Sequence, residues 1–294
     1  MNIKTKAPWF LLLLLILIVS LSRSAGAQVD LAGQWRTLQF NDHLDIGDYT
    51  GIPLSEAGRL RAESYSPDQV DLSENLCRPI PADMGYRVHS SEFYMSAEMD
   101  KDTQKVVAFH THLFWGENEQ TIWVDGRPHP PDYAPHTWEG FSTGKWEGDA
   151  LVVTTDHLKE GYLTRAGVFR SAKAVETTRI NRYGNILVMT FIINDPAYLA
   201  EPYIIESRWI YDPTQVLPPF PCEIATEGQV VPLGTVPSFL PGENPLLRDF
   251  AAEYGIPPEA ALGGAETTRP EYIQKMQKMT KLPGKTTKHY ARNG

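Results

Sequence analysis

Residues 123–155 read WVDGRPHPPDYAPHTWEGFSTGKWEGDALVVTT, and the organisation of the whole chain follows most readily from this stretch. It begins as a strand, continues as a loop with prolines at 128, 130, 131 and 135, and ends in a hairpin around Gly148-Asp149. Each proline fixes its own φ and restricts the preceding residue, so the loop is expected to be stiff. A stiff loop bearing His, Asp, Arg and Trp suits ligand capture or catalysis.

Strand signals continue on both sides of this stretch. We expect strands at residues 30–40, 93–98, 105–115, 121–124, 145–147, 150–155, 175–183, 186–193 and 203–211. Gly148-Asp149 and Gly184-Asn185 are typical of two-residue hairpin turns. Eight or nine antiparallel strands leave exposed edges unless the sheet closes, so the sequence predicts an antiparallel β-barrel. A barrel of this size is filled by side chains or holds one small ligand.

The remaining segments predict a three-part organisation. Residues 1–27 form a signal peptide, residues 28–215 the barrel domain, and residues 216–294 a proline-rich wrap followed by helices. Within the barrel domain Ser55 is placed to cap a short helix over residues 55–64. In the last part helices are expected at 245–254, 257–262 and 269–281, the first ended by Gly255.

The N-terminus predicts export. Lys4 and Lys6 precede an apolar run over residues 9–19, and Ala25-Gly-Ala27 offers a small-residue cleavage site, which is the order of a secretory signal peptide. The apolar run is short for a membrane span. We therefore expect a periplasmic or secreted protein with no membrane span after cleavage.

Charge argues against a nucleic-acid partner. The formal net charge is −9. Cleavage after residue 27 removes three basic residues (Lys4, Lys6 and Arg23), which leaves a charge of about −12, whereas nucleic-acid binding needs a basic surface. The oligomeric state is not indicated.

Two cysteines, Cys77 and Cys222, remain in the exported chain. An even pair in an exported protein is compatible with a disulfide. Two buried thiols are the alternative, because free cysteine is frequently buried.

The proline-rich loop supplies the candidate catalytic residues. His129 and His136 are the proton-transfer candidates, because histidine titrates near neutral pH. Asp125 is expected to orient a histidine and Arg127 to stabilise an oxyanion. In the alternative interpretation the loop seals one end of the barrel, and Asp125 and Arg127 bind the backbone.

Candidate ligand-binding residues are mostly aromatic. Tryptophans at 35, 115, 123, 138, 146 and 209 lie on or beside expected strands, where they fill the core or line a pocket. The predicted ligand contacts are Trp123, Tyr133, Trp138, Trp146 and Arg170. Arg170 is proposed as a bidentate clamp for a carboxylate, although exposed ion pairs also explain the arginines and Glu176 around it.

A divalent metal site is a further possibility. His110 and His112 are two apart on an expected strand and therefore share a face. With Glu117 they resemble the His-x-His-x(4)-Glu motif of the cupin family, whose barrels hold a metal. The glycine expected six positions before the first His is Gln104, and no second cupin motif occurs. The alternative is a polar patch, and no other cofactor is expected.

Other catalytic classes find little support. No Gly-x-Ser-x-Gly elbow occurs, so nucleophilic catalysis is poorly supported. No Gly-x-Gly-x-x-Gly motif or P-loop occurs, so a nucleotide cofactor is not expected.

Two resemblances bear on the fold. Gly33-Gln-Trp35 resembles the lipocalin signature, in which the Trp plugs one barrel end. Asp125-Gly-Arg-Pro-His-Pro130 followed by Gly144-Lys-Trp-Glu-Gly-Asp149 resembles a family of exported bacterial proteins of uncharacterised function, as do residues 250–257 and 263–272. That resemblance implies a lipocalin-like barrel and periplasmic life, and no established activity. Where that family has Pro-His-Ser, this chain has Phe169-Arg-Ser171.

The sequence thus leaves three functions open. The preferred one is a periplasmic barrel that binds an apolar or aromatic small molecule, and acid/base chemistry of isomerase, hydratase or lyase type is the reaction expected if the protein is also an enzyme. The second is a metal-dependent barrel enzyme using His110, His112 and Glu117. The third is a non-catalytic structural envelope protein. Whether the protein is an enzyme is not decided by the sequence.

Overall fold

The computed structural model describes residues 29–39, 45–71, 81–87, 92–114, 118–217, 232 and 234–279. The chain divides into two units, Met1–Asp30 and Leu31–Gly294, and the strands and helices given below all belong to the second. The predicted signal peptide, the pair Cys77 and Cys222, and Trp115 and Glu117 lie outside the described residues.

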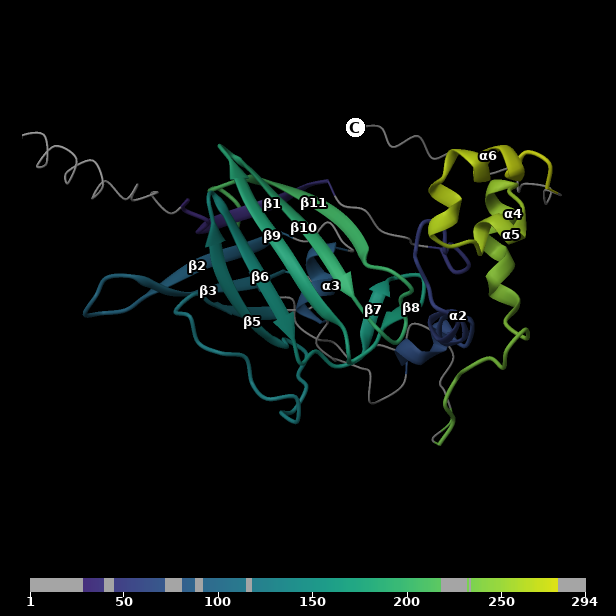
Figure 1. Ribbon diagram of the computed structural model, residues 1–294, viewed down its shortest axis with the longest axis horizontal. Coiled ribbons are helices and arrows are strands. Elements are labelled where there is room, and N and C mark those ends of the chain that lie inside the picture. The colour runs from purple at the N-terminus through teal and green to yellow at the C-terminus, as the bar shows by residue number, and fades with distance from the viewer. Residues whose placement is uncertain are drawn as a thin grey trace, which may run out of the picture. The chain divides into compact units, whose positions relative to one another are not determined.

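Within the described residues, nine strands close into a barrel in the order β1-β11-β10-β9-β6-β5-β4-β3-β2 (Figure 1). Their bounds are β1 Gly33–Gln39, β2 Phe93–Met99, β3 Val106–Leu113, β4 Asn118–Trp123, β5 Phe141–Glu147, β6 Ala150–Asp156, β9 Val175–Tyr183, β10 Ile186–Asn194 and β11 Tyr203–Tyr211. The mainly β barrel is therefore confirmed. So are the two predicted hairpins, whose turn residues Gly148 and Gly184 both have φ of +61°, as primed turns require.

The prediction that all the strands are antiparallel is wrong at one pair. β4 and β5 run parallel, with Ile122 opposite Ser142 and Trp123 opposite Thr143. A two-residue turn reverses the chain, whereas residues 124–140 are long enough to leave the sheet and re-enter it in the same direction. The barrel is consequently mixed, and its parallel register places Trp123 beside Thr143.

Strand register defines two ends of the barrel. Trp35 lies opposite Tyr211 and Phe93 at one end. Its indole N–H donates to Leu31 O at 3.1 Å. At the other end Phe141 pairs with Asp156, and Thr155 pairs with Glu176. We refer to the second as the Glu176 end, and the proline-rich loop joins the strands there.

A short helix, α3 (Ala82–Arg87), enters the barrel from the Glu176 end and contacts β4, β7 and β11 (Figure 1). Its Tyr86 ring stacks on Phe191 at 6.3 Å and meets Phe93 and Trp209 edge-on. The Tyr86 hydroxyl donates to Thr111 Oγ1. A two-stranded sheet of β7 (Gly161–Thr164) and β8 (Val168–Arg170) covers α3.

The remaining helices do not belong to the barrel wall. They are α2 (Glu56–Glu63), α4 (Asp249–Tyr254), α5 (Pro258–Ala261) and α6 (Pro270–Met276), with 3-10 turns at Pro67–Asp71, Pro245–Arg248 and Ala265–Thr268. Ala62 of α2 and Leu247 of the turn at Pro245–Arg248 are buried in one apolar cluster with Ile193 of β10 and Tyr203 of β11, which joins these two elements to the barrel.

Sequence signals placed most of these helices correctly. Ser55 caps α2 by accepting from Gly58 N at 3.1 Å. Gly255, in the left-handed region, ends α4. α6 is shorter than the predicted 269–281. Across the residues described, no helix has the length and apolar character needed to cross a membrane.

Candidate active site

The proline-rich loop folds back onto the outer face of β5 and β6 at the Glu176 end. There His129 packs edge-on against Phe141 at 5.2 Å. Its Nε2 lies 2.7 Å from Thr143 Oγ1, and its Nδ1 lies 2.8 Å from Asp156 Oδ2. The approach to Asp156 is close but not aligned, because Nδ1 makes no hydrogen bond among the residues described. The Thr143 hydroxyl, the His129 imidazole and the Asp156 carboxylate therefore lie next to one another in that order.

His157 binds the other oxygen of the Asp156 carboxylate. Its Nδ1 lies 2.7 Å from Asp156 Oδ1 and its Nε2 lies 3.1 Å from Pro131 O. Both partners only accept hydrogen bonds, so the two bonds form together only when His157 is an imidazolium. The hydrogen bond to Asp156 accordingly raises the pKa of His157, and the charge of Asp132 adds to the effect, against a smaller opposing effect of burial.

The backbone of His157 is unusual as well. Its φ is +54°, which is an uncommon conformation for a residue with a Cβ. Thr137 N donates to His157 O at 2.8 Å, and Lys159 N donates to Thr137 O at 2.9 Å. The loop is therefore fastened to the end of β6 on both sides of this residue. Such local strain persists where surrounding contacts enforce it, frequently at functional sites.

His136 completes the group. Its Nδ1 lies 2.9 Å from Leu158 O, and its ring centroid lies 5.3 Å from that of His157. We define the loop cluster as His129, His136, Thr143, Asp156 and His157. The structure thus brings together both histidines predicted from the sequence, and adds three residues that the prediction did not include.

The other two predicted catalytic residues pair with each other. The Arg127 guanidinium holds Asp125 with contacts as short as 2.6 Å, and it lies 3.3 Å from the ring centroid of Trp123. This hydrogen bonding lowers the pKa of Asp125. Asp156, and not Asp125, is the carboxylate beside the histidines. Trp123, over whose ring Arg127 lies, is the strand partner of Thr143.

The remaining predicted ligand contacts are scattered. Tyr133 is 90% exposed at the loop tip. Trp138 lies with its ring 4.9 Å from the Lys159 ammonium. Trp146, on β5, is partly buried, and its indole N–H has no hydrogen-bond partner among the described residues. Trp123 lies beside the loop cluster, because it is the strand partner of Thr143.

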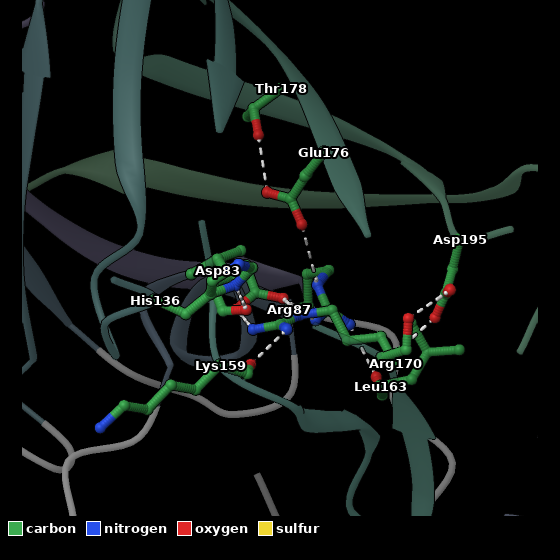
Figure 2. A network of polar contacts seen from close by, with 11 residues as sticks. Asp83, Arg87, His136, Lys159, Leu163, Arg170, Glu176, Thr178 and Asp195 are labelled. Carbon is green, nitrogen blue, oxygen red and sulfur yellow. Dashed lines mark hydrogen bonds and ion pairs between the residues drawn. The ribbon is translucent and has the colours of Figure 1, made fainter. Parts of the chain in front are cut away.

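Arg170, the last residue of β8, is fully buried and clamps the carboxylate of Asp83 (Figure 2). Its Nε and Nη2 donate to Asp83 Oδ2 and Oδ1 at 2.7 and 2.9 Å. Arg87 Nη2 donates to the same carboxylate at 2.8 Å. Burial opposes the charge on Asp83, but the two guanidinium groups outweigh it and hold its pKa well below the usual range. All three side chains are inaccessible to solvent.

Glu176 is an ionisable group of the barrel interior, so the expectation that exposed ion pairs explain Glu176 and Arg170 is wrong. It is 3% exposed. Thr178 donates to its Oε1 at 2.9 Å. Its Oε2 lies 3.9 Å from Arg87 Nε, and neither atom has a hydrogen-bond partner among the described residues. Burial, reinforced by the charge of Asp83, raises the pKa of Glu176 to about 7. The alternation of inward and outward residues along β9 predicts that Glu176 is buried, because it shares the inward face with Thr178 and Ile180.

Little space remains inside the barrel. The cavity beside Glu176 has a volume of about 10 Å³ and is lined by side chains that include Tyr86, Thr111, Gln120 and Thr178. That is room for about one water molecule, whereas small-molecule pockets occupy roughly 300 Å³ or more. The described side chains therefore fill the interior, with Tyr86 at its centre.

The two histidines proposed as metal ligands face outward from β3. His110 lies between Glu98 (2.8 Å) and Thr121 (3.2 Å), and His112 lies 3.6 Å from Glu119. Glu117, the third proposed ligand, is outside the described residues. Across the described part of the chain, no three or more His, Cys, Asp or Glu side chains are arranged to hold a metal ion.

The polar groups of the Glu176 end thus form two sets, the loop cluster outside β6 and the Asp83, Arg87, Arg170 and Glu176 network inside the barrel. The chain matches no protein-family model, no curated protein and no solved structure. Its membership of the exported bacterial family therefore stays a prediction.

Proposed function

We propose that the protein catalyses proton transfer on a small molecule at the loop cluster. The observation that carries this proposal is the Asp156 carboxylate between the imidazoles of His129 and His157, at 2.8 and 2.7 Å. A carboxylate that orients and polarises an imidazole is the usual support of a histidine acid/base. The reaction types consistent with it are those expected from the sequence, namely isomerisation, hydration and elimination.

Each group then has a role. His129 is the general acid/base, since its Nε2 faces outward toward a hydroxyl and its Nδ1 faces Asp156. His157 holds Asp156 and the loop in place. His136 packs beside His157, with ring centroids 5.3 Å apart, and ties the loop to Leu158 O. Arg127 supplies positive charge for a developing oxyanion, as such donors commonly do.

The substrate that this site suits is apolar or aromatic. Phe141 packs against His129, and Trp123 lies beside Thr143 with Arg127 over its ring. Aromatic faces of this kind bind flat apolar molecules, and the cation binds a polar end. We place the substrate on this outer face, because the barrel interior has room for about one water molecule.

Deuterium exchange tests the proposal even with an unidentified substrate. The protein is incubated in D₂O with a small-molecule extract of the cells that make it, and the extract is analysed by mass spectrometry. We expect at least one compound to gain deuterium or to be consumed, and this change to fall at least 100-fold in His129→Gln and Asp156→Asn.

Two further variants make the result specific. Thr154→Val alters an outward threonine on β6 that lies opposite Thr143, and it should leave exchange unchanged. His112→Gln should also leave it unchanged, and a loss there would point to the metal-dependent alternative. Exchange that persists in both cluster variants would refute the proposal.

The filled interior favours one second candidate, a non-catalytic structural envelope protein. A barrel whose interior is filled by its own side chains leaves no room there for a ligand. This alternative predicts that no compound in the extract changes and that the cluster variants differ from the wild type only in stability.

We further propose a lipocalin-like barrel in an exported protein. Burial of Trp35 at one barrel end supports the lipocalin likeness, and the parallel β4–β5 pair departs from it. The charged, apolar and small-residue order of residues 1–27 supports a periplasmic location. N-terminal sequencing of protein from the periplasmic fraction should begin at Gln28.

A further inference from the structure

We infer that Thr143 is a nucleophile and that the loop cluster transfers acyl groups from esters. This inference rests on the proposed acid/base role of His129 and names a substrate class for it. The atom that His129 Nε2 faces is the Thr143 hydroxyl oxygen, at 2.7 Å. The proton best placed for His129 to accept is therefore one carried by the protein itself.

The order of groups is that of a nucleophile, a base and an orienting carboxylate. Thr143 lies on β5, His129 on the loop between two prolines, and Asp156 at the end of β6. When Thr143 donates to Nε2, the imidazole proton resides on Nδ1, which lies 2.8 Å from Asp156 Oδ2. This geometry of hydroxyl, imidazole and carboxylate recurs on unrelated folds that carry out acyl transfer.

Exposure is compatible with this role. Thr143 is partly exposed on the outer face, and His129 and Asp156 each expose 24% of their side chains. Asp156 is held from its other side by His157, so the carboxylate is fixed before a substrate arrives. A small rotation of the His129 ring aligns Nδ1–H with Asp156, and catalytic hydrogen bonds commonly tighten only in the substrate complex.

The reaction balances with groups already named. The Thr143 Oγ–H bond breaks, its proton moves to His129 Nε2, and Oγ bonds to the ester carbonyl carbon. The carbonyl oxygen takes the electron pair and develops negative charge. Collapse of this intermediate breaks the bond to the leaving alcohol, which takes the proton from Nε2. Water then attacks the acyl-threonine with His129 as base, which releases the acid and restores Thr143.

An activated ester tests the inference directly. The protein is mixed with p-nitrophenyl acetate, release of p-nitrophenolate is followed, and the intact protein and its peptides are analysed by mass spectrometry. We expect one acetyl group per chain, located on Thr143. Acylation should fall at least 100-fold in Thr143→Val and in His129→Gln.

Conservative and control variants distinguish a nucleophilic hydroxyl from a structural one. Thr143→Ser keeps a hydroxyl and should retain acylation. If the Thr143 hydroxyl had only a structural role, its removal in Thr143→Val would leave acylation unchanged. Thr154→Val, on the opposite strand position, should react like the wild type. Circular dichroism checks that each variant is folded.

The outcomes separate this inference from the proposed function. If Thr143→Val keeps its deuterium exchange but the wild type is not acylated at Thr143, the nucleophile is wrong and the proton-transfer proposal stands. Acetyl groups found only on lysines would likewise refute the inference. If deuterium exchange and acylation both fail, both proposals fall.

Discussion

Two buried carboxyl groups at the Glu176 end respond in opposite ways to the same surroundings. Asp83 accepts three hydrogen bonds from two guanidinium groups. Glu176 accepts one, from Thr178, and lies 3.9 Å from the nearest guanidinium nitrogen. Burial disfavours the charge of both, and direct hydrogen bonds to the ionised form outweigh burial only at Asp83. The donors from the two guanidinium groups thus keep Asp83 ionised, whereas Glu176, with one donor, titrates near neutral pH.

This difference predicts a pH-dependent stability for Glu176. Its pKa is raised from 4.5 to about 7, so the folded state binds this proton more tightly than the unfolded state. The resulting stabilisation is fully present below pH 4.5 and is lost as the pH rises through about 7. Relative to Glu176→Gln, which does not titrate, the wild type should therefore lose a few kcal/mol, on the order of 3, across that window. Urea unfolding of both proteins at several pH values measures this, and a constant difference would contradict it.

At the residue level the sequence predicted two of the five residues of the loop cluster. His129 and His136 stood out because prolines surround them. Thr143, Asp156 and His157 did not, because they come from two strands whose register with the loop is a tertiary property. Asp156-His157 does follow directly on the apolar alternation of β6, and polar residues at a strand end are a signal that could have been used.

At the level of elements, local chemistry determined the hairpins and caps, but the loop direction and α3 depended on distant contacts. Turn residues report the reversal they cause, so both hairpins were predictable. The residues of the loop do not by themselves predict that β4 and β5 run parallel. α3 contains Gly85 and spans six residues, so it has little intrinsic helicity. Burial of Tyr86 and the bonds of Asp83 and Arg87 stabilise it instead.

The anchoring of α3 gives a second prediction. Arg170→Met leaves Asp83 buried with one of its two cationic partners removed, and such a change typically costs about 3–5 kcal/mol. The matched control is Arg179→Met, which removes an exposed pair with Glu147 at 3.3 Å and should cost less than about 1 kcal/mol. Denaturant midpoints of the two variants provide the comparison. Equal losses would show that the buried network does not anchor the helix.

For the whole molecule, closure of the sheet was predictable and the content of the barrel was not. Strand count and the cost of open edges imply closure. Whether an aromatic-rich barrel is hollow depends on what enters it. What enters this barrel is Tyr86, on the helix α3, which is not one of the wall strands. Trp35 and Trp209 are buried in the core and do not line a pocket.

Removal of the Tyr86 side chain should convert the filled barrel into a hollow one. Tyr86→Ala deletes a ring that contacts Phe93, Phe191 and Trp209, and large-to-small changes of this kind cost about 3–5 kcal/mol. The cavity left is lined largely by apolar side chains, and such cavities bind small aromatic molecules. Phenol should therefore raise the melting temperature of Tyr86→Ala by several degrees and leave that of the wild type unchanged.

Tyr133→Ala, at a position that is 90% exposed, is the control that removes the same ring without opening a cavity. If phenol stabilises the wild type equally, the barrel admits ligands with Tyr86 in place, and the substrate of the loop cluster need not be confined to the outer face.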